Sequence, residues 1–315
     1  MLFFRTVDKI IAIIARTQNL RELQVANTIK LLDGGATIPF VSRYRKEMTG
    51  GLDEVQIANI QLQNEKLQEL CHRREYILTT IEEQGKLTPE LKQQLEQCWD
   101  ATTLEDIYLP YKPKRKTRAE AARKLGLEPL ADSLMLHPFN QPEKAAASYV
   151  GEGVPDIEAA LQGARDIIAE RINESNDVRN IVRRTFQLDA VITSKVVKAK
   201  QEEAKKYSDY FDWSEPLKRC SSHRLLAMRR GEAEGFLRIT ITPSDDSACL
   251  SRIERLYVKN GSPAAPHLIQ AIEDAYKRLL RPSIETEFAF SAKAKADDEA
   301  IRVFAQNLRQ LLLES

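Results

Sequence analysis

Glycine and proline are scarce in this 315-residue chain, which contains only 12 and 13 of them. A chain with few turn-forming residues and many Glu, Lys, Leu, Ala and Gln residues is usually helical. Aromatic residues make up only 7% of the chain, but 43% of its residues are hydrophobic. That hydrophobic content excludes a disordered protein, because disordered chains lack so many large apolar residues.

Cysteine is also rare, and its four copies are scattered without paired spacing, at Cys71, Cys98, Cys220 and Cys249. This pattern excludes a disulfide framework and argues against a four-ligand zinc site. We therefore expect no metal and a reducing compartment, the cytoplasm.

The chain lacks an excess of charge and a long apolar run. Its 47 basic and 46 acidic residues leave a net charge of +1, so any surface that binds nucleic acid must be local. The apolar start at residues 1–14 is interrupted by Asp8 and Lys9, and Arg16 closes it too early for a membrane span. We expect a buried first helix and no membrane partner.

Motifs that mark common catalytic centres are absent: the sequence has no Walker loop, G-x-S-x-G, H-E-x-x-H or G-x-G-x-x-G. The paired acids at 245–246 stand at a predicted helix start, where carboxylates complement the helix dipole. The chain is therefore predicted not to be an enzyme, with no catalytic residues, no cofactor and no small-molecule substrate.

Hydrophobic periodicity and capping residues predict a mainly α fold. The predicted helices cover residues 6–16, 20–32, 52–83, 88–99, 117–126, 129–136, 142–149, 155–171, 177–206, 223–230, 244–258, 266–280 and 283–313, with a short helix near 36–46. Residues 236–243 alternate apolar and polar side chains and form the best strand candidate. At most a short β segment is expected there.

A local excess of positive charge lies in thirteen residues, which we call the basic segment (112–124). It holds seven basic residues and one acid. Such a cluster attracts phosphates, because neutralising them releases condensed counterions. The predicted nucleic-acid-binding residues here are Lys112, Lys114, Arg115, Lys116, Arg118, Arg123 and Lys124.

The prolines and the capping residues in and around the basic segment also predict its local structure. Pro110 and Pro113 favour extended backbone, and Thr117 with Glu120 has the spacing of a capping box that begins a helix. Amide donors and the positive end of the helix dipole would favour an anion at that point. The simpler alternative is a solvated charged loop.

A second basic stretch surrounds one aromatic residue, in the run Arg43, Tyr44, Arg45, Lys46. Arg43, Arg45 and Lys46 join the predicted nucleic-acid-binding residues, because cations beside a ring can hold phosphate and stack a base. We favour a simpler interpretation, a surface helix in which Tyr44 packs inward and Arg43 pairs with nearby carboxylates. One aromatic ring is not a stacking platform.

Several strings in the chain resemble signatures of the Tex family of bacterial transcription accessory proteins, which are related to a eukaryotic transcription elongation factor. The strings are residues 36–47, 49–54, 104–115, 210–213, 226–235, 274–280 and 299–304. The resemblance implies an all-helical N-terminal region with a helix-turn-helix element. In the family an RNase H-like domain, helix-hairpin-helix motifs and an OB-fold RNA-binding domain follow.

The resemblance places this chain before the RNase H-like domain, as an N-terminal fragment. We expect a helical domain at 1–206 and a helical connector with a short strand at 207–315. Arg179, Arg183 and Lys195 lie on predicted helices that could belong to the helix-turn-helix element, although pairing with nearby acids explains the arginines equally well.

The predicted function is non-catalytic binding of RNA or DNA, without sequence specificity, through phosphate contacts. The alternative is a helical scaffold that positions downstream domains and docks proteins of the transcription machinery.

Overall fold

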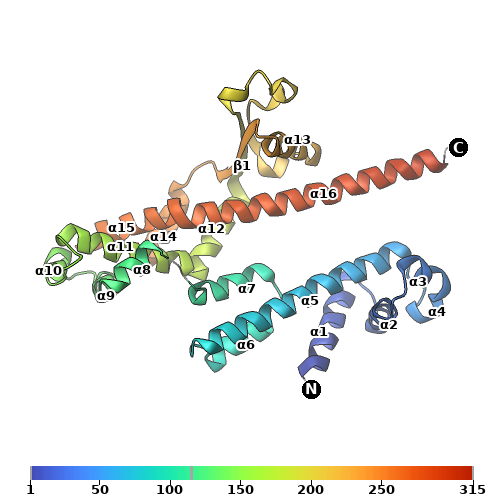
Figure 1. Ribbon diagram of the computed structural model, residues 1–315, viewed down its shortest axis with the longest axis horizontal. Coiled ribbons are helices and arrows are strands. Elements are labelled where there is room, and N and C mark those ends of the chain that lie inside the picture. Colours follow the sequence, from blue (N-terminus) through green and yellow to red (C-terminus); the bar gives the residue numbers. More distant parts are fainter. Residues whose placement is uncertain (1, 114–115, 314–315) are drawn as a thin grey trace. The chain divides into compact units, whose positions relative to one another are not determined.

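The computed structural model describes residues 2–113 and 116–313. These residues form sixteen α-helices and one three-stranded antiparallel sheet (Figure 1). This confirms the predicted mainly α fold with a short β segment. The chain divides into two compact units, unit 1 (Met1–Lys112) and unit 2 (Pro113–Ser315).

Unit 1 is built on the long helix α5. Its first half packs through Ile57 and Ile60 against α1, α2 and α3, and its second half packs through Ile77 and Ile81 against α6 and α7. The Asp53 carboxylate begins α5 by accepting a hydrogen bond from the Gln56 amide. The elements are α1 (Leu2–Gln18), α2 (Glu22–Asp33), α3 (Ile38–Tyr44), α4 (Lys46–Thr49), α5 (Glu54–Glu83), α6 (Pro89–Gln97), α7 (Ala101–Tyr108) and the 3₁₀ turn η1 (Leu109–Tyr111).

Unit 2 is centred on the buried helix α11. Gly163 lets α11 approach the chain between α8 and α9 closely, since a Cβ there would lie 2.4 Å from Leu127 Cδ1. The helices are α8 (Arg118–Lys124), α9 (Glu128–Leu136), α10 (Pro142–Ala147), α11 (Ile157–Glu174), α12 (Asn176–Asp189), α13 (Ser222–Ala233), α14 (Ser247–Tyr257), α15 (Ala265–Asp274) and α16 (Arg281–Leu313). A π-helical turn, η5 (Ala275–Leu280), joins α15 to α16.

The sheet of unit 2 has the strand order β2-β1-β3 and is formed by β1 (Ala190–Val196), β2 (Asp212–Pro216) and β3 (Leu237–Pro243). Ile192 lies opposite Ile241 on its buried face. The outer edge of β3 is covered by carboxylates, because the Ile239 amide donates to Glu232 and the Ile241 amide donates to Glu285. These hydrogen bonds occupy edge amides that would otherwise be free to pair with another β-strand.

The strand expected at 236–243 is confirmed as β3. The helix expected through 195–206 is wrong, because Ala190–Val196 is a strand, followed by the 3₁₀ turns η2 (Lys198–Lys200) and η3 (Lys205–Tyr210). Every second residue of β1 is buried from Ala190 to Ser194, which is the period of a half-buried strand. Strand β2 lies between the predicted helices 177–206 and 223–230, where no element is predicted.

The predicted domain boundary between 206 and 207 stays a prediction. β1 pairs with β2 across that position, with Thr193 opposite Ser214.

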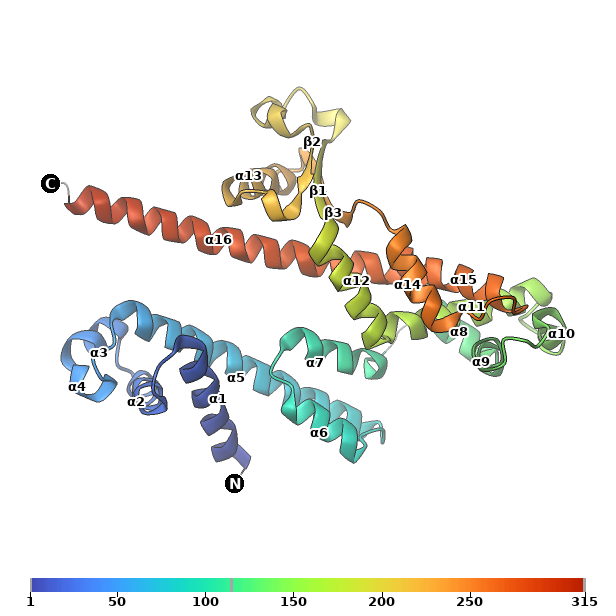
Figure 2. The same ribbon diagram turned by 180° about the vertical axis from the view of Figure 1, so that it is seen from behind.

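Helix α16 continues well past the rest of unit 2 (Figure 2). Its first part packs on α12, α13 and β3, and Ile284 and Ala296 are buried there. The exposed large apolar residues of its second half are Ile301, Val303, Phe304, Leu308, Leu311, Leu312 and Leu313. None of the helices within 2–113 and 116–313 combines the length and hydropathy needed to cross a bilayer.

A polar cluster around the buried Arg165 joins α10, α11 and α15. The Arg165 guanidinium donates to Gln162 and Glu158 and lies 3.0 Å from Nδ1 of His267. On the other side of the ring, His267 Nε2 lies 3.9 Å from a Glu143 carboxylate oxygen. Burial and the adjacent Arg165 charge lower the pKa of His267, and the two glutamates offset only part of this effect.

We expect the stability of the chain to fall as pH drops through about 6.5, the ordinary histidine pKa. Below that pH the His267 ring takes up a proton in the unfolded chain but stays neutral in the folded chain, because its folded pKa is lower. Proton binding therefore favours unfolding until the pH also falls below the folded pKa. Urea unfolding at pH 7.5 and 5.5 should show a smaller loss for His267→Gln than for the unchanged chain. The exposed His137, changed to Gln, provides the control. Equal losses in all three proteins would contradict the prediction.

Candidate nucleic-acid interface

The basic segment follows η1 in the chain and includes α8. Lys112, Lys116, Arg118 and Lys124 are exposed, whereas Arg123 is half-buried. Lys114 and Arg115 lie outside the described residues. Lys116 has a φ of 54°, a left-handed conformation that turns the chain just before the helix begins. The exposed members therefore present their charges to solvent.

A carboxylate from elsewhere in the chain, that of Glu170 on α11, is bound at the start of α8. The Thr117 hydroxyl accepts a hydrogen bond from the Glu120 amide at 3.0 Å, as predicted for a helix cap, and donates to Glu170 at 3.1 Å. The other Glu170 oxygen accepts a hydrogen bond from Arg123 Nη1 at 2.6 Å. The buried Glu170 carboxylate thus occupies a place beside the cap where the sequence suggested an external anion.

Arg123 is surrounded by acids. Besides Glu170, its guanidinium lies 3.6 Å from Glu128 and 4.0 Å from Glu120. Arg118 acts on a carboxylate of α11: burial raises the pKa of Asp166, and the charge of Arg118 is among the influences that oppose this rise. Arg123 therefore anchors α8 to α11. The exposed Lys124 also lies 4.0 Å from Glu120, but its side chain is far more exposed than that of Arg123.

The second predicted stretch lies on α3 and α4. The Tyr44 side chain is 64% exposed, so the expectation that it packs inward is wrong. Arg43 lies 4.0 Å from the Glu54 carboxylate, and both side chains remain mostly exposed. The Arg45 guanidinium lies 5.1 Å from the ring centre of Phe40, and Lys46 is exposed.

The arginines considered for a helix-turn-helix element contact α16. Arg183 Nε donates to both carboxylate oxygens of Glu287, at 2.9 and 3.0 Å, and Arg179 donates to the Ser283 hydroxyl at 3.3 Å. Lys195 lies on β1, opposite Arg238 of β3, and not on a helix. The helix-turn-helix element stays a prediction.

A further group of cations lies between β1 and β2 and is not among the residues predicted from the sequence. Lys198, Lys200, Lys205 and Lys206 are exposed there, although Lys206 pairs with Glu234 at 2.6 Å. The recurring lysines are the only local signal for this group. That signal is ambiguous, because lysines are equally ordinary on the solvent-exposed side of a helix. The sequence predicts a helix through these residues, where the structure has a strand and 3₁₀ turns.

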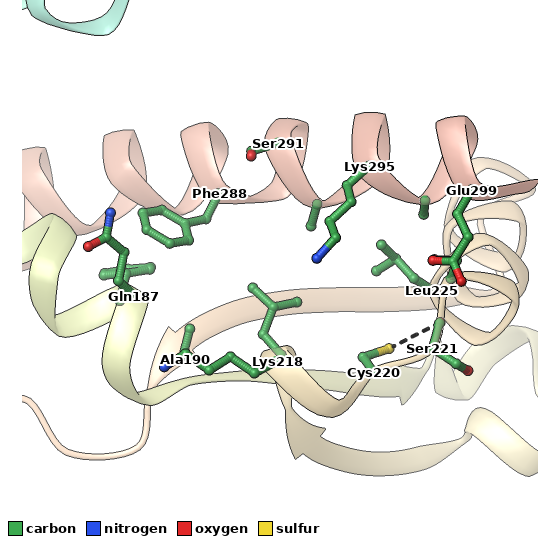
Figure 3. A pocket seen from close by; sticks show the side chains of 15 residues that line it. Gln187, Ala190, Lys218, Cys220, Ser221, Leu225, Phe288, Ser291, Lys295 and Glu299 are labelled. Atoms are coloured by element: carbon green, nitrogen blue, oxygen red, sulfur yellow. Dashed lines mark hydrogen bonds between the residues drawn. The ribbon is translucent and has the colours of Figure 1, made fainter. Parts of the chain in front are cut away.

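A cavity of about 430 Å³ lies between α12, α13, α16 and the 3₁₀ turn η4 (Leu217–Arg219). Figure 3 shows Lys295 reaching from α16 towards the chain around Cys220. Burial and the neighbouring Glu215 raise the pKa of the Cys220 thiol to about 12, so it is not a thiolate at neutral pH. Within 2–113 and 116–313, no group of three or more His, Cys, Asp or Glu residues could hold a metal ion.

Two family models match the chain. The model described as Tex-like protein N-terminal domain matches residues 8–82, and the model described as Tex central region-like matches residues 137–304. The second match alone covers more than half of the chain.

Curated relatives match over nearly the whole chain. Protein YhgF of Escherichia coli is 43% identical over 97% of this chain and 41% of its own length. The transcriptional accessory protein Tex of Neisseria gonorrhoeae is 40% identical over 96% of this chain and 40% of its own length. The human S1 RNA-binding domain-containing protein 1 is 29% identical over 97% of this chain and 32% of its own length. The chain thus spans about two fifths of the bacterial relatives.

The change Glu170→Gln should lower the free energy of unfolding by about 1–3 kcal/mol, because it leaves the half-buried Arg123 without its closest carboxylate. Urea denaturation monitored by circular dichroism measures the loss. The exposed Glu152, changed to Gln, should stay within about 0.5 kcal/mol of the unchanged chain. A similarly small effect for Glu170→Gln would show that the pair does not anchor α8.

Proposed function

The chain belongs to the Tex family, and from that premise we propose that it is a non-catalytic nucleic-acid-binding region of a transcription accessory protein. The observation that carries the proposal is the exposure of Lys112, Lys116, Arg118 and Lys124 within one short segment of a nearly neutral chain. Clustered exposed cations bind phosphates through counterion release.

The proposed contacts are with the phosphate backbone and not with base edges. Reading a base edge needs side chains held in a groove in fixed geometry. Lysine supplies a mobile point charge, in contrast to the planar fork of arginine. Because phosphate charge is common to RNA and DNA, the proposal covers both. Lys114, Arg115 and the unit 1 cations Arg43, Arg45 and Lys46 are included among the proposed phosphate-binding residues.

The relatives support the cellular context of the proposal. One bacterial relative is named for transcription, and the human relative is named for an S1 RNA-binding domain. We extend the association with transcription and nucleic acid to this chain. We also propose that it is located in the cytoplasm, where bacterial transcription takes place. Proteins of the transcription machinery are the proposed protein partners.

A second candidate function is protein docking by a helical scaffold. Its support is the second half of α16, where Ile301, Phe304, Leu308 and Leu311 are exposed. Large apolar side chains gathered on one element are typical of interaction surfaces. Recovery of the same transcription proteins before and after nuclease treatment, and their loss in a Phe304→Ser/Leu308→Ser variant, would favour this candidate.

Neutralising the basic segment tests the first proposal. A variant in which Lys112, Lys114, Arg115 and Lys116 become Gln should bind labelled oligonucleotides of unrelated sequence more weakly and to a similar degree. The slope of log affinity against log salt should become shallower by about 0.9 for each duplex phosphate that the variant no longer neutralises, and by about 0.7 for each single-strand phosphate. Fluorescence anisotropy at several salt concentrations measures both quantities.

The matched control changes Lys66, Lys86, Lys144 and Lys259 to Gln, which alters the net charge equally at exposed positions elsewhere. It should bind almost as well as the unchanged chain. If the two variants have the same affinity and salt slope, the basic segment is not the phosphate-binding site.

A further inference from the structure

An aromatic and cationic surface on α3 has a geometry suited to stacking. The rings of Phe40 and Tyr44 lie 5.4 Å apart between centroids and are tilted by 42°. The Arg45 guanidinium lies 5.1 Å from the Phe40 centroid, and its Nη1 donates to the Tyr44 carbonyl at 3.2 Å. We call Phe40, Tyr44 and Arg45 the stacking platform.

The platform faces solvent because of its positions on the helix. Phe40 and Tyr44 are four residues apart, so they share a face of α3. Val41 and Ser42 occupy the opposite face and are buried against the rest of unit 1. Phe40 remains 40% exposed and Tyr44 64% exposed, so Tyr44 offers the larger accessible ring surface.

Helix α3, which carries the two rings, is tied to α5, and the adjoining helix α4 is tied to α2. Gln24 Nε2 donates to the Thr49 carbonyl at 3.0 Å, and Asn27 Nδ2 donates to the Met48 carbonyl at 2.8 Å. The buried Ser42 hydroxyl lies 3.2 Å from a Glu54 carboxylate oxygen. A rigid aromatic surface loses little conformational entropy when it binds, so these contacts preorganise the platform.

Cations flank the platform. Arg43 and Lys46, which lie one residue before and two residues after Tyr44 in the sequence, are exposed, and Glu54 lies at the 4.0 Å limit of an ion pair with Arg43. An exposed ring beside positive charges can stack a base while the cations hold the adjoining phosphates. A base inside a duplex is already stacked on its neighbours, so its face is not accessible.

We propose that the stacking platform binds an unpaired base of single-stranded nucleic acid. Tyr44 stacks the base, Phe40 and Arg45 support the Tyr44 ring, and Arg43 and Lys46 contact phosphates. This inference rests on the proposed nucleic-acid-binding function and adds a preference for single strands. Nucleic acid is favoured over a protein partner because the exposed cations next to the rings can pair with phosphates that adjoin a stacked base.

The test is fluorescence anisotropy with one labelled oligonucleotide, as DNA and as RNA, in three forms: single-stranded, duplex, and a single strand carrying abasic positions. Tyr44→Ala should weaken binding to the single strand by about 5- to 100-fold, the range expected when one base is no longer stacked. Affinity for the duplex and for the abasic strand should change less than about twofold. The salt slope should stay the same, because the change removes no charge.

Two variants serve as controls. Tyr44→Trp keeps an aromatic face, so it should retain single-strand binding, and its added indole fluorescence should be quenched by the oligonucleotide. Phe139→Ala removes a ring that is 68% exposed in unit 2 and should leave the affinity unchanged. Circular dichroism shows whether each variant is folded, and the exposure of Tyr44 predicts that it is.

The outcomes separate this inference from the proposed function. Unchanged single-strand affinity in Tyr44→Ala, with weaker binding by the basic-segment variant, overturns the stacking platform and leaves phosphate binding in place. Equal losses of affinity on duplex, single strand and abasic strand also overturn it. Weaker binding by Tyr44→Ala without any effect of the basic-segment variant supports the platform and overturns the basic segment as the phosphate site. An unchanged chain that binds no oligonucleotide overturns both.

Discussion

The buried carboxylate of Glu170 is the group on which the arrangement of the basic segment depends. It receives hydrogen bonds from Thr117 at the start of α8 and from Arg123 near its end. A short helix of seven residues has little stability of its own, because nucleation is costly and few hydrogen bonds follow. Fixing both ends to one side chain of α11 gives α8 its position, and α8 in turn sets where the exposed Arg118 and Lys124 emerge.

The surroundings of each basic residue, more than the number of basic residues, therefore decide which of them can meet an external phosphate. Arg123, Arg165 and Arg183 are directed at carboxylates of the chain itself. Arginine suits this role because its planar fork matches a carboxylate and is weakly hydrated, while lysine keeps its compact charge in water. A count of basic residues thus overestimates the surface that can meet phosphate, and Lys112 and Lys116 are the clearer candidates.

Local signals in the sequence predict part of this structure. Capping residues such as Thr88 and Thr117 bond to amides three residues away, so the helix starts beside them are predictable. Strand β1 is not, because it is defined by its pairing with β2 and β3, which come later in the chain, and its own residues leave only a weak local pattern. The partner of Arg123 escapes prediction for the same reason, since Glu170 is 47 residues away. The exposure of Tyr44 depends on how α3 packs, which no single-residue pattern encodes.

Phosphate binding and base stacking suit the same task for different physical reasons. Every nucleotide carries a phosphate and a π face, so neither interaction discriminates between sequences. Phosphate attraction weakens as salt rises, whereas stacking by an uncharged ring involves no counterion release and persists. A protein that relied on the exposed lysines alone would bind duplexes and single strands alike. Adding Tyr44 introduces selection by strandedness, because only an unpaired base exposes the face that the ring requires. A nearly neutral chain can thus obtain selectivity from one rigid aromatic surface without a large basic patch.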